Sequence, residues 1–315
     1  MYIALAGGVG GAKLALGLAQ VLPPHDLIVA VNTGDDFDHL GLRICPDIDT
    51  VIYTLAGMAN PKTGWGLRGE TWQFMDALEQ LGGETWFRLG DRDIATHIER
   101  TRLLQSGETL SEVTARFAGR LGLRHRILPA TDDPLRTFVE TTEGPLPFQE
   151  YFVKRQCAPV ATGFEFRGAA QATPSPEISR AFESGDVEGI ILCPSNPYVS
   201  IAPIMAIAAI GEFVTRSKVP VIAVSPIVGG RAIKGPAAKI MTELGATPSA
   251  TSIAAHYRDL VTGLVIDTAD ATEADAIRAL GIDVAVTGTV MNTGRDKATL
   301  ARDVLEFAQT LRRPA

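Results

Sequence analysis

A glycine-rich turn close to the N-terminus could bind a phosphate group. It reads Gly7-Gly8-Val9-Gly10-Gly11-Ala12-Lys13. Small residues let backbone N–H groups approach a phosphate, and a helix that follows adds the positive end of its dipole. Neither the G-x-G-x-x-G fingerprint nor the P-loop pattern is complete, so a tight strand-to-helix turn without a ligand is the alternative. We predict phosphate contacts from four residues of the turn: Gly8, Gly10, Gly11 and Lys13.

Two adjacent aspartates follow the second apolar run of the chain, in Asn32-Thr33-Gly34-Asp35-Asp36. Adjacent carboxylates are poor core residues, because a buried charge must be paired or bound to a metal. Mg²⁺ prefers one or two carboxylates together with substrate phosphates. Opposite a phosphate-binding turn, Asp35 and Asp36 therefore predict a catalytic magnesium site. A solvated turn or helix cap is the alternative.

Further charged residues lie between residues 39 and 102. In HLGLRICPDIDT, at residues 39–50, Pro46 and Asp47 indicate a helix start, where Asp47 or Asp49 could simply complement the helix dipole. Farther on, Asp93 and His97 are four residues apart and share a helix face. A lone histidine is usually structural, but this one has an acid and arginines beside it, which makes a site role an equal alternative.

Two proline-bearing loops in the C-terminal half complete the candidate set, Cys193-Pro194-Ser195-Asn196-Pro197 and Ser225-Pro226-Ile227-Val228-Gly229-Gly230. Ser195 and Asn196 offer donors and acceptors for a nucleoside or phosphate edge. Gly229, Gly230 and the later Lys234 suit phosphate oxygens. Each signal is weak alone, and the four loops together make a stronger case.

The elements that must position these loops read as a parallel α/β sheet. Short apolar runs each end in one of the polar loops, and helical segments separate them. Ligands of such sheets bind at the carboxyl ends of the strands. Strands are predicted at Tyr2–Ala6, Leu27–Val31, Glu188–Leu192, Val219–Val224, Leu264–Asp267 and Asp283–Val286, and the first helix at Ala12–Leu22.

The middle of the chain breaks this alternation. Helices are predicted at Glu70–Leu81, Arg92–Leu104 and Leu110–Leu121, and short strands and turns at Phe138–Pro176. We expect a Rossmann-like core from residues 1–60 and 187–315, with residues 61–186 inserted as a mainly helical cap over the active site. Core and cap would form one functional unit.

Composition excludes several classes of protein. The 315 residues are 46% hydrophobic, with a net charge of −7, which does not suit a nucleic-acid binder. Three scattered cysteines predict neither disulfides nor a zinc site, and the cytoplasm is the expected setting. The apolar N-terminus lacks the basic start of a secretory signal, and glycine pairs interrupt it too early for a membrane span. Neither a membrane nor a nucleic acid is expected as a partner.

Taken together, these segments resemble the CofD family, called FbiA in actinobacteria, the 2-phospho-L-lactate transferases of coenzyme F420 biosynthesis. The likeness runs from about residue 2 to beyond residue 290, without departure at the charged positions. It rests on AGGVGGAKLA (6–15), VNTGDD (31–36), HLGLRICPDIDTVIYTLAG (39–57), LGDRDIATHIERT (89–101), ILPATDDPLRT (127–137), FQEYFVKR (148–155), CPSNPYVSIAPI (193–204) and SPIVGGRAIKGPAAKIM (225–241).

This resemblance implies a Mg²⁺-dependent transfer. The ribityl hydroxyl of 7,8-didemethyl-8-hydroxy-5-deazariboflavin (Fo) attacks the terminal phosphorus of a guanosine diphosphate that carries an acid, and GMP leaves. The acid is 2-phospholactate, phosphoenolpyruvate or 3-phosphoglycerate. Family members are often dimeric, so a homodimer is expected. The resemblance assigns Fo binding to Asp49 and Arg88 and metal binding to the segment Asn32–Asp36; Asn32, Thr33 and His97 are further expected contacts of Fo, and Asp49 is the candidate for orienting or deprotonating its hydroxyl.

A second function remains open from the sequence. Gluconeogenesis-factor proteins resemble this chain in the glycine turn and the paired acids, and they look like regulators that bind sugar nucleotides without turnover. Such a regulator would not need GLRICPDIDT, LGDRD and CPSNP together, and this chain has all three.

Overall fold

A seven-stranded parallel sheet lies at the centre of the protein. The computed structural model describes residues 1–312. The strand order is β14-β13-β10-β9-β1-β2-β5, and every neighbouring pair is parallel. This confirms the predicted α/β class. The strands are β1 (Tyr2–Ala6), β2 (Leu27–Val31), β5 (Arg126–Pro129), β9 (Gly189–Leu192), β10 (Val221–Val224), β13 (Gly263–Asp267) and β14 (Asp283–Thr287).

Alternate residues of each strand point into two separate cores. In β1, Ile3 and Leu5 belong to one core, and Ala4 and Ala6 to the other. A sheet buried on both faces needs continuous apolar runs, and this is why its strands read as LIVAV or VIAV instead of as an alternating pattern.

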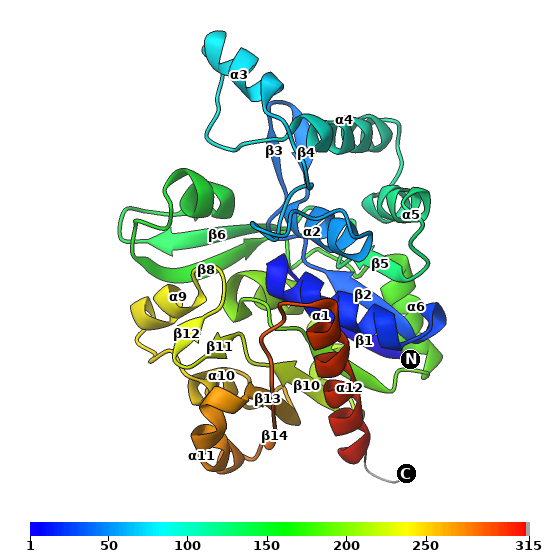
Figure 1. Ribbon diagram of the computed structural model, residues 1–315, viewed down its shortest axis with the longest axis vertical. Helices are drawn as coiled ribbons and strands as arrows, with labels where there is room; N and C mark the ends of the chain where they lie inside the picture. The colour runs from blue at the N-terminus through cyan, green and yellow to red at the C-terminus, as the bar shows by residue number, and fades with distance from the viewer. Residues whose placement is uncertain (313–315) are drawn as a thin grey trace.

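Helices cover both faces of the sheet (Figure 1). One core contains side chains of α1 (Gly8–Val21), α2 (Pro46–Leu55), α5 (Leu110–Arg120) and α12 (Gly294–Thr310). The opposite core contains side chains of α6 (Pro176–Ser184), α7 (Ala202–Met205), α8 (Ala208–Arg216), α9 (Ala237–Glu243), α10 (Ala250–His256) and α11 (Ala274–Arg278).

The order of the strands creates a crevice beside β1. From β1 the chain builds outward through β2 to β5, and it then returns to β9 on the other side of β1. After β1 the chain runs to one face of the sheet, as α1, and after β9 it runs to the opposite face, as α7 and α8. Such a switch point is where parallel α/β sheets bind their ligands. The glycine turn follows β1, and the segment Cys193–Asn196 follows β9.

The first helix begins earlier than the sequence predicted. We expected it at Ala12, and α1 begins at Gly8, so most of the glycine turn forms the first helical turn. The amides of that turn lack partners within the helix, as in every helix N-terminus.

Residues 61–186, expected as a cap, also supply part of the central sheet. Their segment Arg126–Pro129 is β5, which pairs with β2 and forms one edge of the sheet. Helices α5 and α6 of residues 61–186 pack on the two faces of the sheet. The elements above the carboxyl ends of the strands in Figure 1 are the hairpin of β3 (Phe37–His39) and β4 (Leu42–Ile44), which precedes this segment, together with α3 (Gln73–Gln80), α4 (Asp91–Gln105) and the small antiparallel sheet of β6 (Arg136–Thr141), β7 (Leu146–Pro147) and β8 (Ala161–Arg167).

Short elements complete the described chain. They are the 3₁₀ turns η1 (Pro24–Asp26) and η4 (Thr268–Glu273), the π-helical turns η2 (Glu150–Lys154) and η3 (Pro197–Ile201), and the hairpin of β11 (Ile227–Val228) and β12 (Arg231–Ala232).

No single helix within residues 1–312 has the length and apolar composition to cross a bilayer. One pair of helices, Pro197–Met205 and Ala208–Arg216, meets these two criteria when it is taken together, and the pair is bent by 94°.

Candidate active site

A cavity of about 680 Å³ opens at the carboxyl ends of the central strands. A volume of this size suits a small-molecule ligand. The loops after β1, β2, β9 and β10 contribute to its wall, together with α2, α4 and η2. The predicted site residues that line it are Gly8, Gly10, Lys13, Asp35, Asp49, Arg88, His97, Ser195 and Asn196.

Six predicted site residues lie behind or outside this wall: Gly11, Asn32, Thr33, Asp36, Gly229 and Gly230. Asn32 and Thr33 are fully buried beneath it. The backbone N–H of Gly229 donates to the carboxylate of Asp270, at 2.9 and 3.2 Å, so this amide already has a partner.

The glycine turn is held between two neighbours. The backbone N–H of Gly8 donates to Asp47 Oδ1 at 2.7 Å. On the other side a Cβ on Gly10 would lie 2.1 Å from the Pro194 carbonyl oxygen, and one on Gly11 would lie 2.5 Å from Ser195 Oγ. Gly10 and Gly11 are therefore required because the loop after β9 packs directly against α1.

Lys13 brings positive charge to this turn. Burial lowers the pKa of its ammonium, and the charges of Lys297 and Lys234 lower it further. An ammonium in such surroundings gains from an anionic ligand, because the ligand offsets both the repulsion and the lost hydration.

Two buried carboxylates share one amide group beside the glycine turn. Nδ2 of Asn32 donates to Asp35 Oδ1 at 3.0 Å and to Asp47 Oδ2 at 2.9 Å. Burial raises the pKa of Asp35 well above its usual value, and the charge of Asp47 raises it further. Burial also raises the pKa of Asp47, to about 6. Two facing acids without a cation are an unfavourable arrangement that a divalent cation would relieve.

Asp36 lies apart from this pair. Its side chain is 2% exposed and does not line the cavity, and its Oδ1 has no hydrogen-bond partner within the described chain. Burial raises its pKa to about 7, against the opposing effects of a hydrogen bond with Cys45 and the charge of Arg136. The structure therefore separates the two aspartates that the sequence grouped together.

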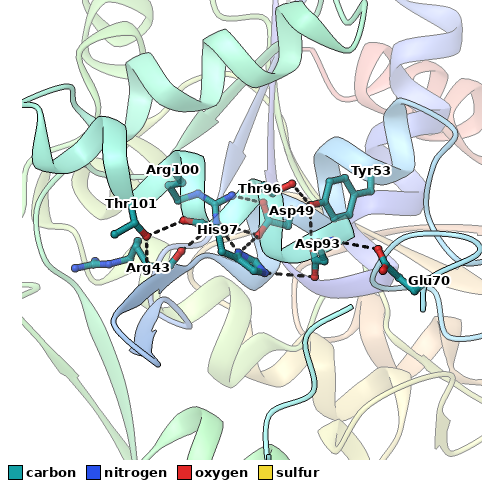
Figure 2. A network of polar contacts seen from close by, with 9 residues as sticks. All are labelled: Arg43, Asp49, Tyr53, Glu70, Asp93, Thr96, His97, Arg100 and Thr101. Carbon is teal, nitrogen blue, oxygen red and sulfur yellow. Dashed lines mark hydrogen bonds and ion pairs between the residues drawn. The ribbon is translucent and has the colours of Figure 1, made fainter. Parts of the chain in front are cut away.

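Asp49 is held in place by a buried arginine. Arg100 of α4 is 1% exposed and donates through both terminal nitrogens to the two oxygens of Asp49 in α2, as Figure 2 shows. Burial raises the pKa of Asp49, while the charge of Arg100 opposes that shift. This bidentate pair fixes the direction of the carboxylate.

His97 joins Asp49 to a second acid. Its Nδ1 lies 3.8 Å from Asp49 Oδ2, and its Nε2 lies 3.3 Å from Asp93 Oδ2 (Figure 2). Tyr53 donates to Asp93 Oδ1 at 2.6 Å. Burial favours a raised pKa for Asp93, but its contacts with His97 and Tyr53 overcome this and lower it. Both His97 nitrogens thus face protein groups, and the ring lies between the two acids.

Aromatic side chains form another wall of the cavity. Trp86 and Phe87 precede α4, and their rings meet edge to face at 5.8 Å. Phe148 and Phe152 stack at 5.4 Å beside η2. Arg88 joins this wall, with its guanidinium 4.4 Å from the ring centre of Trp72. A flat, conjugated ligand fits such a surface.

The loop after β9 closes the crevice at the other side of β1. Ser195 Oγ donates to the Gly7 carbonyl at 2.8 Å and accepts from the Gly7 N–H at 3.1 Å, which ties the two loops together. Asn196 caps η3 through Oδ1 and lines the cavity; its buried Nδ2 has no partner in the described residues. Of the two, Asn196 is the residue with a free donor for a ligand.

Sequence reasoning missed several residues of the wall. Asp47 was considered only as a helix-dipole partner, although it binds the glycine turn and Asn32. The aromatic wall was missed because its members come from distant segments without a common spacing. Pro46 offered a usable signal for Asp47. A proline at the first turn of a helix marks the helix start, so it indicates that Asp47 and Asp49 both belong to the first turn of α2.

Comparison with known proteins identifies the family. The model of 2-phospho-L-lactate transferase CofD matches residues 3–290. The chain belongs to this family. A Streptomyces griseus relative named phosphoenolpyruvate transferase is 42% identical in sequence, and the alignment covers 98% of this chain and 99% of the relative's chain. A Methanosarcina mazei relative named 2-phospho-L-lactate transferase is 36% identical, and the alignment covers 96% of this chain and 99% of the relative's chain.

The fold of this CofD-family protein also occurs in a more distant group. A crystal structure of a UPF0052-family protein from Bacillus halodurans superposes with a TM-score of 0.63, over 96% of this chain and 98% of the other. Sequence identity is 13%, so the likeness concerns the fold alone.

Proposed function

We propose that this protein transfers a phospho-carboxylic acid from its guanosine diphosphate ester to the ribityl hydroxyl of Fo, releasing GMP. The product is F420-0 or its dehydro or related analogue. Its family membership and its relatives named phosphoenolpyruvate and 2-phospho-L-lactate transferases support this reaction.

One observation carries the proposal: a single cavity joins the glycine turn with Lys13, buried acids and an aromatic wall. Gly8 of the turn is bonded to Asp47, and Asp47 shares the Asn32 amide with Asp35, so the turn and the acids are adjacent. Asp49, two residues beyond Asp47, connects through His97 to α4, beside which the aromatic wall begins. A diphosphate at the turn and a flat ring at the wall would meet beside the acids.

Mg²⁺ is part of the proposal, with Asp35 and Asp47 as the residues that would hold it. Their fit is the pair of facing, buried carboxylates whose pKa values are raised. Within residues 1–312 no group of three or more His, Cys, Asp or Glu side chains is arranged for a metal, so substrate oxygens would complete the coordination. When bound, Mg²⁺ would neutralise charge on the phosphate oxygens.

The chain's own residues then align the two substrates. Lys13 and the N-terminus of α1 hold the diphosphate, and Asn196 contacts the nucleoside. Asp49, fixed by Arg100, accepts a hydrogen bond from the attacking hydroxyl, while Arg88 and the aromatic wall hold the deazaflavin ring. Phosphoryl transfer needs mainly such alignment and charge neutralisation.

Three finer features are also proposed. Phosphoenolpyruvate is the favoured donor acid, because the relatives that carry that name are up to 42% identical. The protein acts as a homodimer, as expected from the family. It works in the cytoplasm, in keeping with three free, buried cysteines.

One incubation tests the reaction and the donor. Purified protein is mixed with Fo, Mg²⁺ and the guanosine diphosphate ester of phosphoenolpyruvate, 2-phospholactate or 3-phosphoglycerate, and products are read by mass spectrometry. We expect GMP together with a phosphodiester of Fo, formed fastest from the phosphoenolpyruvate donor. Absence of product from all three donors would overturn the proposed reaction.

A further inference from the structure

A second lysine lies beside the glycine turn and has no role so far. Within residues 1–312, the lysine and arginine side chains that line the cavity are Lys13, Arg88 and Lys234. Lys234 follows the β11–β12 hairpin, in a segment that is exposed to solvent. Its ammonium donates to the backbone carbonyl of Thr63, which comes from the loop after α2. Two loops distant in sequence therefore meet at this ammonium.

The contacts of Gly64 locate this ammonium next to the phosphate-binding turn. A Cβ built on Gly64 would lie 3.5 Å from Lys234 Nζ and 2.6 Å from Val9 Cγ1. Val9 belongs to the glycine turn. The charge of Lys234 also lowers the pKa of Lys13, after the larger effects of burial and of Lys297. Both ammonium groups thus border the same turn, and Lys297 does not line the cavity.

Lys234 has no acid to neutralise it. Among residues 1–312 the only lysine that pairs with an acid is Lys239, which contacts Glu243. The partner of Lys234 is a neutral carbonyl, which water could satisfy equally well after the lysine moves. Exchange of that carbonyl for an anionic ligand group therefore costs little and gains a charge-assisted hydrogen bond.

The donor of the proposed reaction carries more negative charge than one lysine matches. Its diphosphate occupies the N-terminus of α1 and Lys13, and its carboxylate still needs a cation. The guanidinium of Arg88 is already engaged with the ring of Trp72 at the aromatic wall. The acids Asp35, Asp47 and Asp49 line the same cavity and would repel an unpaired carboxylate.

We propose that Lys234 binds the carboxylate of the donor acid. The assignment rests on the proposed function, and it makes Lys234 the residue that distinguishes an acid-bearing donor from a simple diphosphate ester. Lys13, in contrast, serves the diphosphate that all such donors share.

The test compares two ligands that differ only in the carboxylate. Binding of the guanosine diphosphate ester of lactate and of the ethyl ester of guanosine diphosphate is measured by calorimetry with Mg²⁺. For Lys234→Met we expect about tenfold weaker binding of the lactate ester and unchanged binding of the ethyl ester. For Lys13→Met we expect both ligands to bind more weakly. Lys218→Met, another exposed lysine far from the cavity wall, controls for overall charge.

Two results would overturn the assignment. One is equal weakening of both esters by Lys234→Met, which would make Lys234 a ligand of the diphosphate. The other is unchanged binding of both. Because Lys234 is exposed, its loss should leave the fold intact, and thermal melting of each variant checks this. If neither ester binds the unaltered protein, the proposed function fails, and this outcome is distinct from the other two.

Discussion

Nδ2 of Asn32 donates to two carboxylates at once, and this shared amide distinguishes Asp35 from its neighbour Asp36. Asp35 faces the cavity and the glycine turn, whereas Asp36 is enclosed near Cys45. The two adjacent acids therefore allow a matched test of which one serves the reaction.

At this residue scale we expect Asp35→Asn to lower kcat about a hundredfold or more, because the proposed charge-neutralising site loses a carboxylate. Asn is similar in shape and relieves repulsion with Asp47, so the variant should remain folded. Asp36→Asn should keep most of the activity. Steady-state kinetics with Fo and the preferred donor provide the measurement. Loss of turnover in Asp36→Asn but not in Asp35→Asn would contradict the geometry and restore the role that the sequence predicted for Asp36.

Between elements, the Asp49–Arg100 pair attaches α4 to α2. Removing one member leaves the other charge buried without a partner, at a cost of about 3–5 kcal/mol. Removing both avoids that cost.

We therefore expect Arg100→Met and Asp49→Asn each to lower the free energy of unfolding strongly, and the double variant to recover much of the loss. Urea titrations of the four proteins give the coupling energy. Additive losses would show that the two side chains do not interact in solution.

Two helical glycines offer a second test at the element scale. A Cβ on Gly17 in α1 would lie 2.2 Å from the Lys297 carbonyl oxygen of α12, whereas one on Gly119 in α5 meets nothing within 4 Å. At Gly17, α1 and α12 are therefore in close contact.

Gly17→Ala should destabilise the protein by about 1–3 kcal/mol, because α1 and α12 must separate. Gly119→Ala should stabilise it by about 0.5–1 kcal/mol, because alanine loses less conformational freedom in a helix. Thermal melting compares them directly. Equal effects of the two substitutions would mean that α1 and α12 are not in close contact.

The sequence predicted those strands and helices that depend on a local pattern of residues. The six apolar runs are strands, and the three predicted helices of the middle region lie at Gln73–Gln80, Asp91–Gln105 and Leu110–Arg120. The strand β5 was missed because RILP is short and lies among helices, and only its pairing with β2 makes it a strand. The sequence placed Gly8, Asp35, Asp49 and His97 in one cleft, and all four line the cavity. It placed Asp36 and Gly229 there as well, and only the packing around these two residues shows that they do not line it.

For the whole molecule, the buried acids make stability depend on pH. A carboxyl with a raised pKa keeps its proton longer in the folded state than in the unfolded state, so folding is favoured at low pH. Asp36 and Asp47 have pKa values of about 7 and 6. Their effect should therefore appear as a loss of stability when the pH rises from about 4 to about 7.

We expect the metal-free protein to melt at a lower temperature at pH 8 than at pH 5. Added Mg²⁺ should raise the melting temperature more at pH 8, since binding needs ionised carboxylates. Differential scanning calorimetry at both pH values, with and without Mg²⁺, measures this, and Ca²⁺ serves as the comparison cation. A melting temperature that rises from pH 5 to pH 8 without metal would contradict the buried-acid assignment.

The position of β5 limits which segments of this protein can be deleted or exchanged. Because that strand lies within residues 61–186, excising the whole segment would strip one border from the sheet and leave the N–H and C=O groups of β2 without partners on that side. A cap grafted from a relative must either bring its own matching strand or leave residues 126–129 of this chain in place. The same stretch of chain thus supplies both an edge strand of the sheet beneath the cavity and elements above it.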